Sequence, residues 1–166
     1  LGVANPNERA LPNGQFSFSD PADAPRYDTF IGIKRSDRSL FGSGYGAKYV
    51  NDYAVPLFPL PDGQFYDVSS TGLHAAGLRV DGKVIVWGNN SFGQLNTPSI
   101  NKKFVRVVTG RYHTCAITED SKVMCWGAGI TGTSDGVWPH YGQSKVPAEL
   151  NDKNVIQLEC GYYFSA

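Results

Sequence analysis

Two stretches of the chain match each other position by position without a gap, and this repeat constrains the fold more than any other feature of the sequence. They are residues 74–88 and 113–127. In each stretch a His comes first, apolar and β-branched residues lead to a short polar turn, and a Trp-Gly pair ends the return segment. Apolar runs on both sides of a polar turn are typical of a β-hairpin. The chain is therefore predicted to repeat one hairpin unit.

Weaker copies extend the repeat toward both ends of the sequence. Residues 30–44 keep the spacing, with a Phe in the place of the His. Residues 155–166 match residues 105–115, with Phe164 in the place of His113, and then stop in mid-hairpin. An unfinished hairpin has apolar residues and backbone groups that must be covered or paired. The predicted units are roughly 27–64, 65–103 and 104–154, followed by an incomplete unit 155–166.

Further landmarks follow each clear copy. A Gly-Gln pair and a Pro lie in residues 93–98 after the first copy and in residues 142–147 after the second. Together with the hairpins, this pattern resembles the regulator-of-chromosome-condensation repeat family. The resemblance covers residues 30–166 and implies an all-β, propeller-like fold, which has about seven blades in that family. It implies little about function, because the family includes exchange factors, an enzyme inhibitor and secreted proteins of unknown role.

Composition supports a turn-rich β protein and excludes some partners. The chain contains 19 Gly, 10 Pro, 9 Tyr and 9 Phe, and no segment has helical periodicity. Fifteen basic and fifteen acidic residues cancel, and the basic residues are dispersed. We therefore expect no nucleic-acid partner, because such binding relies on neutralising phosphates. No apolar run approaches the ~20 residues of a membrane span, so no membrane insertion is expected.

The first 26 residues differ from the rest, because they are rich in Pro and Asn. This composition predicts an extended arm over residues 1–26 ahead of a repeat domain over residues 27–166. Within the arm, Phe16 and Phe18 alternate with Ser, so both would lie on one face of a strand. Two interpretations stay open for that strand. It docks on its own domain, or it is donated to the unfinished unit 155–166 of the same chain or of a neighbour.

Aromatic residues recur at fixed places in the repeat. Trp87 and Trp126 occupy the same position of the two clear copies, and so do His74 and His113. The position of the two His residues holds Phe in the weaker copies, so it is interpreted as a packing site for a planar ring. All four residues are predicted to form the repeat core. No metal-binding or catalytic motif is present in the sequence, and we expect neither a cofactor nor enzymatic activity.

The three cysteines are interpreted separately. Cys115 and Cys125 lie symmetrically about Asp120, so they should face each other across the hairpin and form a disulfide, or remain a pair of buried thiols. A disulfide would indicate an extracellular or cell-surface protein. Cys160 is either buried or paired outside the chain. The triplet that starts at Asn89 is a candidate glycosylation site.

The hairpin of the second clear copy is followed by an insertion that the first copy lacks. Residues 128–141 combine flexible Gly with the aromatic residues Trp138, His140 and Tyr141. Aromatic side chains on such an insertion predict a contact surface for protein or glycan, and the alternative is a loop folded back on its own blade. Tyr162 and Phe164 of the incomplete unit are further candidate interface residues.

These features lead to one functional hypothesis and one alternative. The first is a non-enzymatic extracellular scaffold that assembles with copies of itself, as a filament or ring, by pairing the arm with the incomplete last unit. The alternative is a fragment of a longer propeller that binds a protein partner through its loops.

Overall fold

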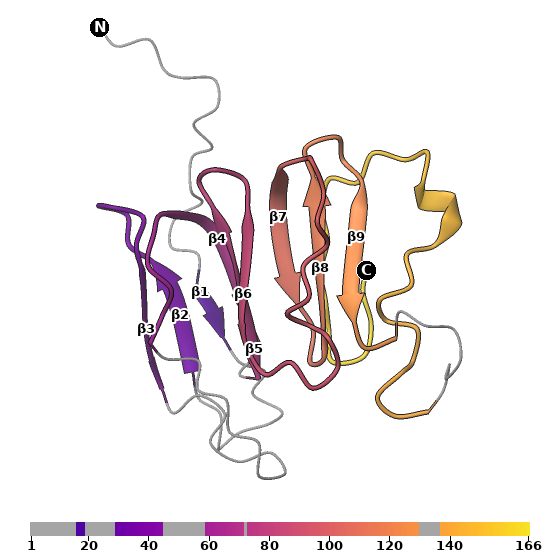
Figure 1. Cartoon of the computed structure of the whole chain (residues 1–166), viewed down its shortest axis with the longest axis horizontal. Helices are drawn as coiled ribbons and strands as arrows, with labels where there is room; N and C mark the ends of the chain where they lie inside the picture. The colour runs from indigo at the N-terminus through magenta and orange to yellow at the C-terminus, as the bar shows by residue number, and fades with distance from the viewer. Residues whose placement is uncertain (1–15, 19–28, 45–58, 72, 130–136) are drawn as a thin grey trace, which may run out of the picture.

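The computed structural model of the chain describes residues 16–18, 29–44, 59–71, 73–129 and 137–166. These residues form three antiparallel sheets of three strands each, which stand side by side along the molecule (Figure 1). The first sheet contains β1 (Phe16–Phe18), β2 (Thr29–Ile33) and β3 (Leu40–Gly44). The second contains β4 (Phe65–Ser70), β5 (His74–Arg79) and β6 (Val84–Gly88). The third contains β7 (Phe104–Thr109), β8 (His113–Thr118) and β9 (Val123–Gly127).

A tight turn in each hairpin forms a backbone hydrogen bond with the unit that follows it. The three turn residues Arg38, Gly82 and Ser121 have positive φ angles of 61°, 86° and 63°. Their carbonyl oxygens accept hydrogen bonds from the first N–H of the following unit, at Phe65, Phe104 and Val155, over 2.9, 2.9 and 3.0 Å. The same backbone bond therefore recurs at three junctions. It places Val155 in the position of Phe104, so the incomplete unit corresponds to residues 104–115, one residue more than the sequence match covered.

The hydrophobic core lies between neighbouring sheets. One cluster joins the second and third sheets, and its buried members are Ala76, Leu78, Val84, Phe104, Val107, Ala116 and Trp126. Another joins the first and second sheets through Ile31, Leu40, Phe65, Val68 and Ala75. A fully buried large side chain stabilises the fold by about 1.5–3 kcal/mol, so these interfaces hold the stack of sheets together. Within the described residues, no helix has the length and apolar character that a membrane span requires.

The strand that contains Phe16 and Phe18 is the first strand of the first sheet. β1 pairs antiparallel with β2, with Phe16 opposite Gly32 and Phe18 opposite Phe30. It occupies the place in its sheet that β4 and β7 occupy in theirs. Of the two interpretations, docking on its own domain is therefore confirmed, and pairing with the unfinished unit 155–166 of the same chain is wrong. The edge of β2 lies closer along the chain, and pairing there closes a shorter loop.

This pairing also changes the predicted domain boundary. The strand β1 lies inside the predicted arm 1–26, yet it belongs to the first repeat. The rest of that arm lies outside the described residues. The first unit therefore begins before residue 27.

The incomplete unit repeats the geometry of the third sheet as far as it goes. The Gly161 N–H donates to the Phe164 carbonyl over 2.9 Å, as the Gly110 N–H donates to the His113 carbonyl over 2.8 Å. A Cβ atom added at either glycine would overlap the ring of the His or Phe three residues later. The prediction that Phe164 takes the place of His113 is therefore confirmed. Unlike the buried His113, Phe164 is 61% exposed.

Candidate functional site

Aromatic side chains gather at one end of the sheets. The loop that follows β6, the turn between β7 and β8 and the described residues just after the grey segment that follows β9 lie at the lower end of the molecule in Figure 1. There the ring of Phe92 meets the ring of Tyr112 edge to face, with centroids 5.0 Å apart. Tyr141 and Tyr163 repeat that contact at the next junction, also at 5.0 Å. The two pairs occupy the same positions of successive repeats, directly before Gly-Gln in one unit and before His113 or Phe164 in the next.

Trp138 sits on the first of these pairs. Its ring lies edge to face with Phe92 at 5.7 Å and with Tyr112 at 5.9 Å. Trp138 is nevertheless 52% exposed, and its neighbour Val137 is 65% exposed. The described residues 137–141 of the insertion thus pack on the molecule and still present a large aromatic side chain to solvent. A Trp held in this way loses little conformational freedom when it binds a partner.

Hydrogen bonds inside the insertion fix this arrangement. The Gly129 N–H donates to Nδ1 of His140 over 3.0 Å. Gln143, which is buried, accepts from the Tyr141 N–H over 2.8 Å and donates its Nε2–H to the Pro139 carbonyl over 2.6 Å. His140 therefore serves as an internal acceptor that shapes the loop, whereas Tyr141, 43% exposed, adds to the accessible aromatic area.

A set of hydrogen bonds between Gln94, Thr114 and His74, which we call the latch, joins the second sheet to the third. The Thr114 hydroxyl donates to the Gln94 carbonyl over 3.0 Å and lies 2.9 Å from Nε2 of His74. Since the hydroxyl proton is used on the carbonyl, Nε2 of His74 carries a proton and donates to Thr114. Trp126 donates its indole N–H to the same Gln94 carbonyl over 2.9 Å.

The same latch recurs one junction later. The Ser165 hydroxyl donates to the Gln143 carbonyl over 2.9 Å and lies 3.0 Å from Nε2 of His113. Burial lowers the pKa of His113 to about 4. Burial, and second the nearby His113, lower the pKa of His74 to about 3. Both imidazoles are therefore neutral near pH 7 and act as packed, hydrogen-bonded parts of the repeat, in line with their predicted core role. Trp87 is half-buried against the cluster between the first two sheets.

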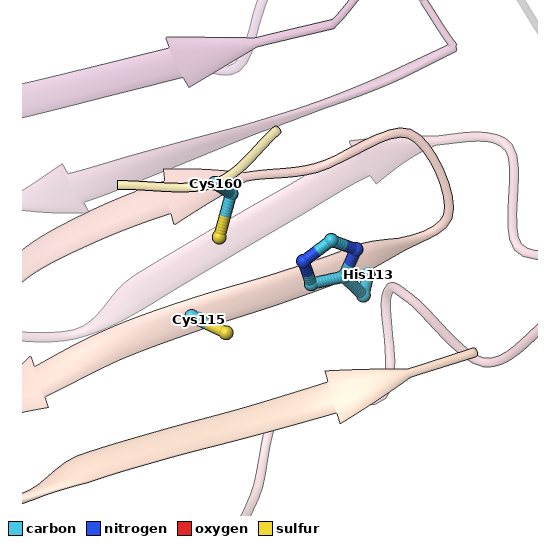
Figure 2. Close-up of side chains that lie close together, drawn as sticks. All are labelled: His113, Cys115 and Cys160. Atoms are coloured by element: carbon cyan, nitrogen blue, oxygen red, sulfur yellow. The ribbon is translucent and has the colours of Figure 1, made fainter. Parts of the chain in front are cut away.

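The three cysteines meet at this second latch. Cys115 and Cys125 are opposite each other in the register of β8 and β9 and form a disulfide, the pairing expected from the sequence. The sulfur atoms of Cys115 and Cys160 and a ring nitrogen of His113 lie within 4.8 Å of one another (Figure 2). Because the Cys115 sulfur is committed to the disulfide, this group does not offer a metal ion two thiolates. Burial raises the pKa of the Cys160 thiol to about 11.

The remaining predicted residues are scattered. Tyr162 stacks under the guanidinium of Arg111 at 4.0 Å, beside Tyr163. The side-chain oxygen of Asn89 accepts hydrogen bonds from the Ser91 N–H and the Gln94 amide, so it shapes the turn, and its glycosylation stays a prediction.

Four residues at the aromatic end were not predicted from the sequence. They are Phe92, Arg111, Tyr112 and Tyr163. Their signal was present, because an aromatic residue precedes Gly-Gln in both clear repeats and a Tyr precedes both His113 and Phe164. Comparing positions between repeats, in place of inspecting the insertion alone, would have found three of them.

Comparisons with known proteins agree with the repeat. The profile of the "Regulator of chromosome condensation (RCC1) repeat" matches residues 65–94 and 104–130. The probable E3 ubiquitin-protein ligase HERC4 of Homo sapiens is 30% identical over 107 residues, covering 57% of this chain and 10% of that protein. The chain therefore spans about a tenth of that relative.

Two solved structures show the same fold. The ectodomain of the receptor kinase CR4 from Physcomitrella patens superposes with a TM-score of 0.56 and 19% identity, covering 82% of this chain and 32% of that one. Yeast RCC1 (Prp20) bound to Kap60 gives a TM-score of 0.56 and 16% identity, covering 89% of this chain and 39% of that one. The predicted all-β, propeller-like fold is confirmed. Residues 65–94 and 104–130 are repeats of the regulator of chromosome condensation type, and the three sheets are arranged as successive blades of a propeller-like fold.

Proposed function

We propose that the chain is part of a longer RCC1-type propeller and acts as a non-enzymatic module that binds a protein partner. The binding site would be the aromatic end surface, which we define as Phe92, Val137, Trp138, Tyr141 and Tyr163; the buried Tyr112 supports it from inside the fold. The observation that carries the proposal is Trp138, half exposed yet held edge to face by two other rings.

The chemistry of this surface fits a protein. Binding hot spots in protein interfaces are enriched in Trp, Tyr and Arg, and the aromatic end surface supplies the first two. Arg111 lies beside it, over the rings of Tyr112 and Tyr162. Loops at one end of a rigid β scaffold are a common place for such contacts. In its solved structure, yeast RCC1 is bound to another protein, Kap60, which supports the same class of role for this fold.

A catalytic role has little support. The buried polar groups of the described sheets, such as His74, His113 and Gln94, are used in the latches between blades. Neither imidazole is a useful base near neutral pH, because burial lowers the pKa of both. The ligase named among the relatives is matched over 10% of its length, so its activity is not carried over.

Self-assembly by strand donation is the weaker candidate. The strand that contains Phe16 is already paired inside its own sheet, so it is not free to be donated. The incomplete unit still exposes apolar residues, with Ile156 92% and Phe164 61% exposed. We propose that this edge takes a further strand of the propeller, and that the protein works in an oxidising, extracellular compartment, for which the disulfide is the support.

The test compares three versions of the chain. Wild type, Trp138→Ala and Val80→Ser would be immobilised, exposed to an extract of the source organism and analysed by quantitative mass spectrometry. Val80 is a matched control, because it is an exposed apolar residue (38%) in the β5–β6 turn, away from the aromatic end surface. We expect partners to be retained by Val80→Ser and lost by Trp138→Ala. Equal capture by all three would contradict the proposal. Binding to a glycan array without any captured protein would also contradict it and would show that the partner is a glycan.

A further inference from the structure

The junction between the third sheet and the incomplete unit departs from the repeat at two facing positions. By the alignment of the latches, Cys115 corresponds to Ala76, and Cys160 corresponds to Thr109. The earlier junction therefore contains the same His and hydroxyl latch without sulfur. Both departures from the repeat are cysteines, and they come from two different units.

The two cysteines are close enough to react. Their sulfur atoms lie within 4.8 Å of each other (Figure 2). The Ser165 hydroxyl lies 3.4 Å from the Cys115 sulfur and 3.5 Å from the Cys160 sulfur. An apolar cluster of Val108, Cys115, Ile117, Cys125 and Leu158 surrounds the group, with Cys160 packed against it. A free thiol beside a disulfide is the arrangement from which thiol–disulfide exchange starts.

We propose that Cys160 is an alternative disulfide partner of Cys115 and that this pairing forms a covalent cross-link between two blades. The bond within the hairpin joins residues 10 apart in sequence, on the adjacent strands β8 and β9. The alternative bond would join β8 to the incomplete unit. It would fix the backbone that leads from Cys160 to Tyr162 and Tyr163, and with it one edge of the aromatic end surface.

The exchange is balanced without an outside oxidant. Cys160 loses its thiol proton to solvent, a step that slows the exchange near neutral pH because burial raises the pKa of this thiol to about 11, and the thiolate attacks the Cys115 sulfur. A new bond forms between Cys160 and Cys115 as the bond between Cys115 and Cys125 breaks. The electron pair leaves on the Cys125 sulfur, which then takes up a proton. The chain holds one disulfide and one thiol before and after the reaction.

The test uses substitutions that the preceding repeat already carries. Val86 stands where the third sheet has Cys125, so Cys125→Val leaves Cys115 and Cys160 without introducing a new polar group. The reduced variant would be oxidised with diamide under native conditions and mapped by peptide mass spectrometry. We expect an intramolecular Cys115–Cys160 disulfide in at least ~tenfold excess over cross-linked dimer, because held groups have a high effective concentration. The matched control is Cys160→Thr, which should keep the Cys115–Cys125 bond.

Wild type supplies a second readout that does not depend on how the variant folds. In a native glutathione redox buffer at pH 8, we expect both the Cys115–Cys125 and the Cys115–Cys160 peptides. Three results would overturn the proposal: alkylation of both thiols in the oxidised Cys125→Val variant, dimer as its main product, or exclusive Cys115–Cys125 pairing in wild type. Retention of Zn²⁺ by the reduced variant, in place of disulfide formation, would also overturn it and indicate a metal site.

Discussion

The two junctions on either side of the third sheet are built on one plan and differ in a few side chains. Both have a buried hydroxyl that donates to a Gln carbonyl and lies beside an imidazole. Both have an edge-to-face aromatic pair at 5.0 Å. The second junction adds cysteines. The insertion after β9 supplies Tyr141 to the second junction, and its Trp138 packs on the aromatic pair of the first. The shared parts hold blades together, and the added parts are where we place function.

The largest expected effect tests the latch that the junctions share. His74 and His113 have pKa values near 3 and 4 in the fold, below the ordinary value of 6.5. Above pH 6.5 the two imidazoles are neutral in both the folded and the unfolded chain. Below pH 6.5 they take up protons in the unfolded chain but stay neutral in the fold. Stability is therefore lost as the pH falls from 6.5 toward 4. Between pH 7 and pH 5 the loss should be about 4 kcal/mol for the pair, measured by urea unfolding.

A substitution separates the two latches. Phe fills the His position in the incomplete unit, so His113→Phe should fold and remove about half of the acid-induced loss, ~2 kcal/mol. An identical pH dependence in wild type and His113→Phe would show that His113 is not the titrating group.

The next effect concerns the sulfur that the second junction has gained. Replacing Cys115 by Ala and Cys125 by Val gives the third hairpin the residues that the second hairpin has. Loss of the disulfide should lower the free energy of unfolding by about 2–4 kcal/mol, because the unfolded chain gains freedom. Thermal melts with and without reductant provide the measurement. Wild type should shift on reduction and the double variant should not, and a wild type that is indifferent to reductant would argue against the bond.

A smaller effect compares two glycines with the same environment. Alanine at Gly110 would overlap the ring of His113, which is fully buried, whereas alanine at Gly161 would overlap the ring of Phe164, which is 61% exposed. Gly110→Ala should destabilise the fold by about 1–3 kcal/mol because the buried ring has nowhere to move. Gly161→Ala should cost less than ~1 kcal/mol. Equal losses in chemical denaturation would mean that the incomplete unit is packed as tightly as the third sheet.

The smallest effect on stability is expected at Trp138. Half of its surface is exposed, so Trp138→Ala should change the free energy of unfolding by no more than ~1 kcal/mol. Partner binding should fall by at least ~2 kcal/mol, or about thirtyfold, if Trp138 is a hot spot. Calorimetric titration with the captured partner measures the second quantity. A large loss of stability with unchanged affinity would reverse the assignment and make Trp138 a core residue.

The repeat made much of the fold predictable from the sequence. The register of His74 opposite Gly88 and of His113 opposite Gly127 follows from the gapless match of the two hairpins. The pairing of Cys115 with Cys125 follows from their symmetry about the turn. The strand with which β1 pairs could not be predicted, because alternating Phe residues define one apolar face of a strand and leave open which sheet edge it joins.

The candidate site was only partly predictable. Trp138 could be predicted as a site residue because it lies in an insertion that the first clear copy of the repeat lacks. Its supports, Phe92 and Tyr112, come from a different loop and a different strand junction, so their contact depends on how blades stack. The approach of Cys160 to Cys115 depends on the same stacking. Contacts between blades are set by tertiary packing, which single-sequence patterns do not encode.

The footprint of the captured partner on the wild-type chain, measured by hydrogen–deuterium exchange, shows directly whether the aromatic end surface is the binding site. If the aromatic end surface binds the partner, amide exchange should slow in residues 137–145 and 110–113, while the β5–β6 turn around Val80 stays unchanged. Protection confined to residues 155–158, at the exposed edge that carries Ile156, would contradict the proposed binding site and place the interface on the incomplete unit.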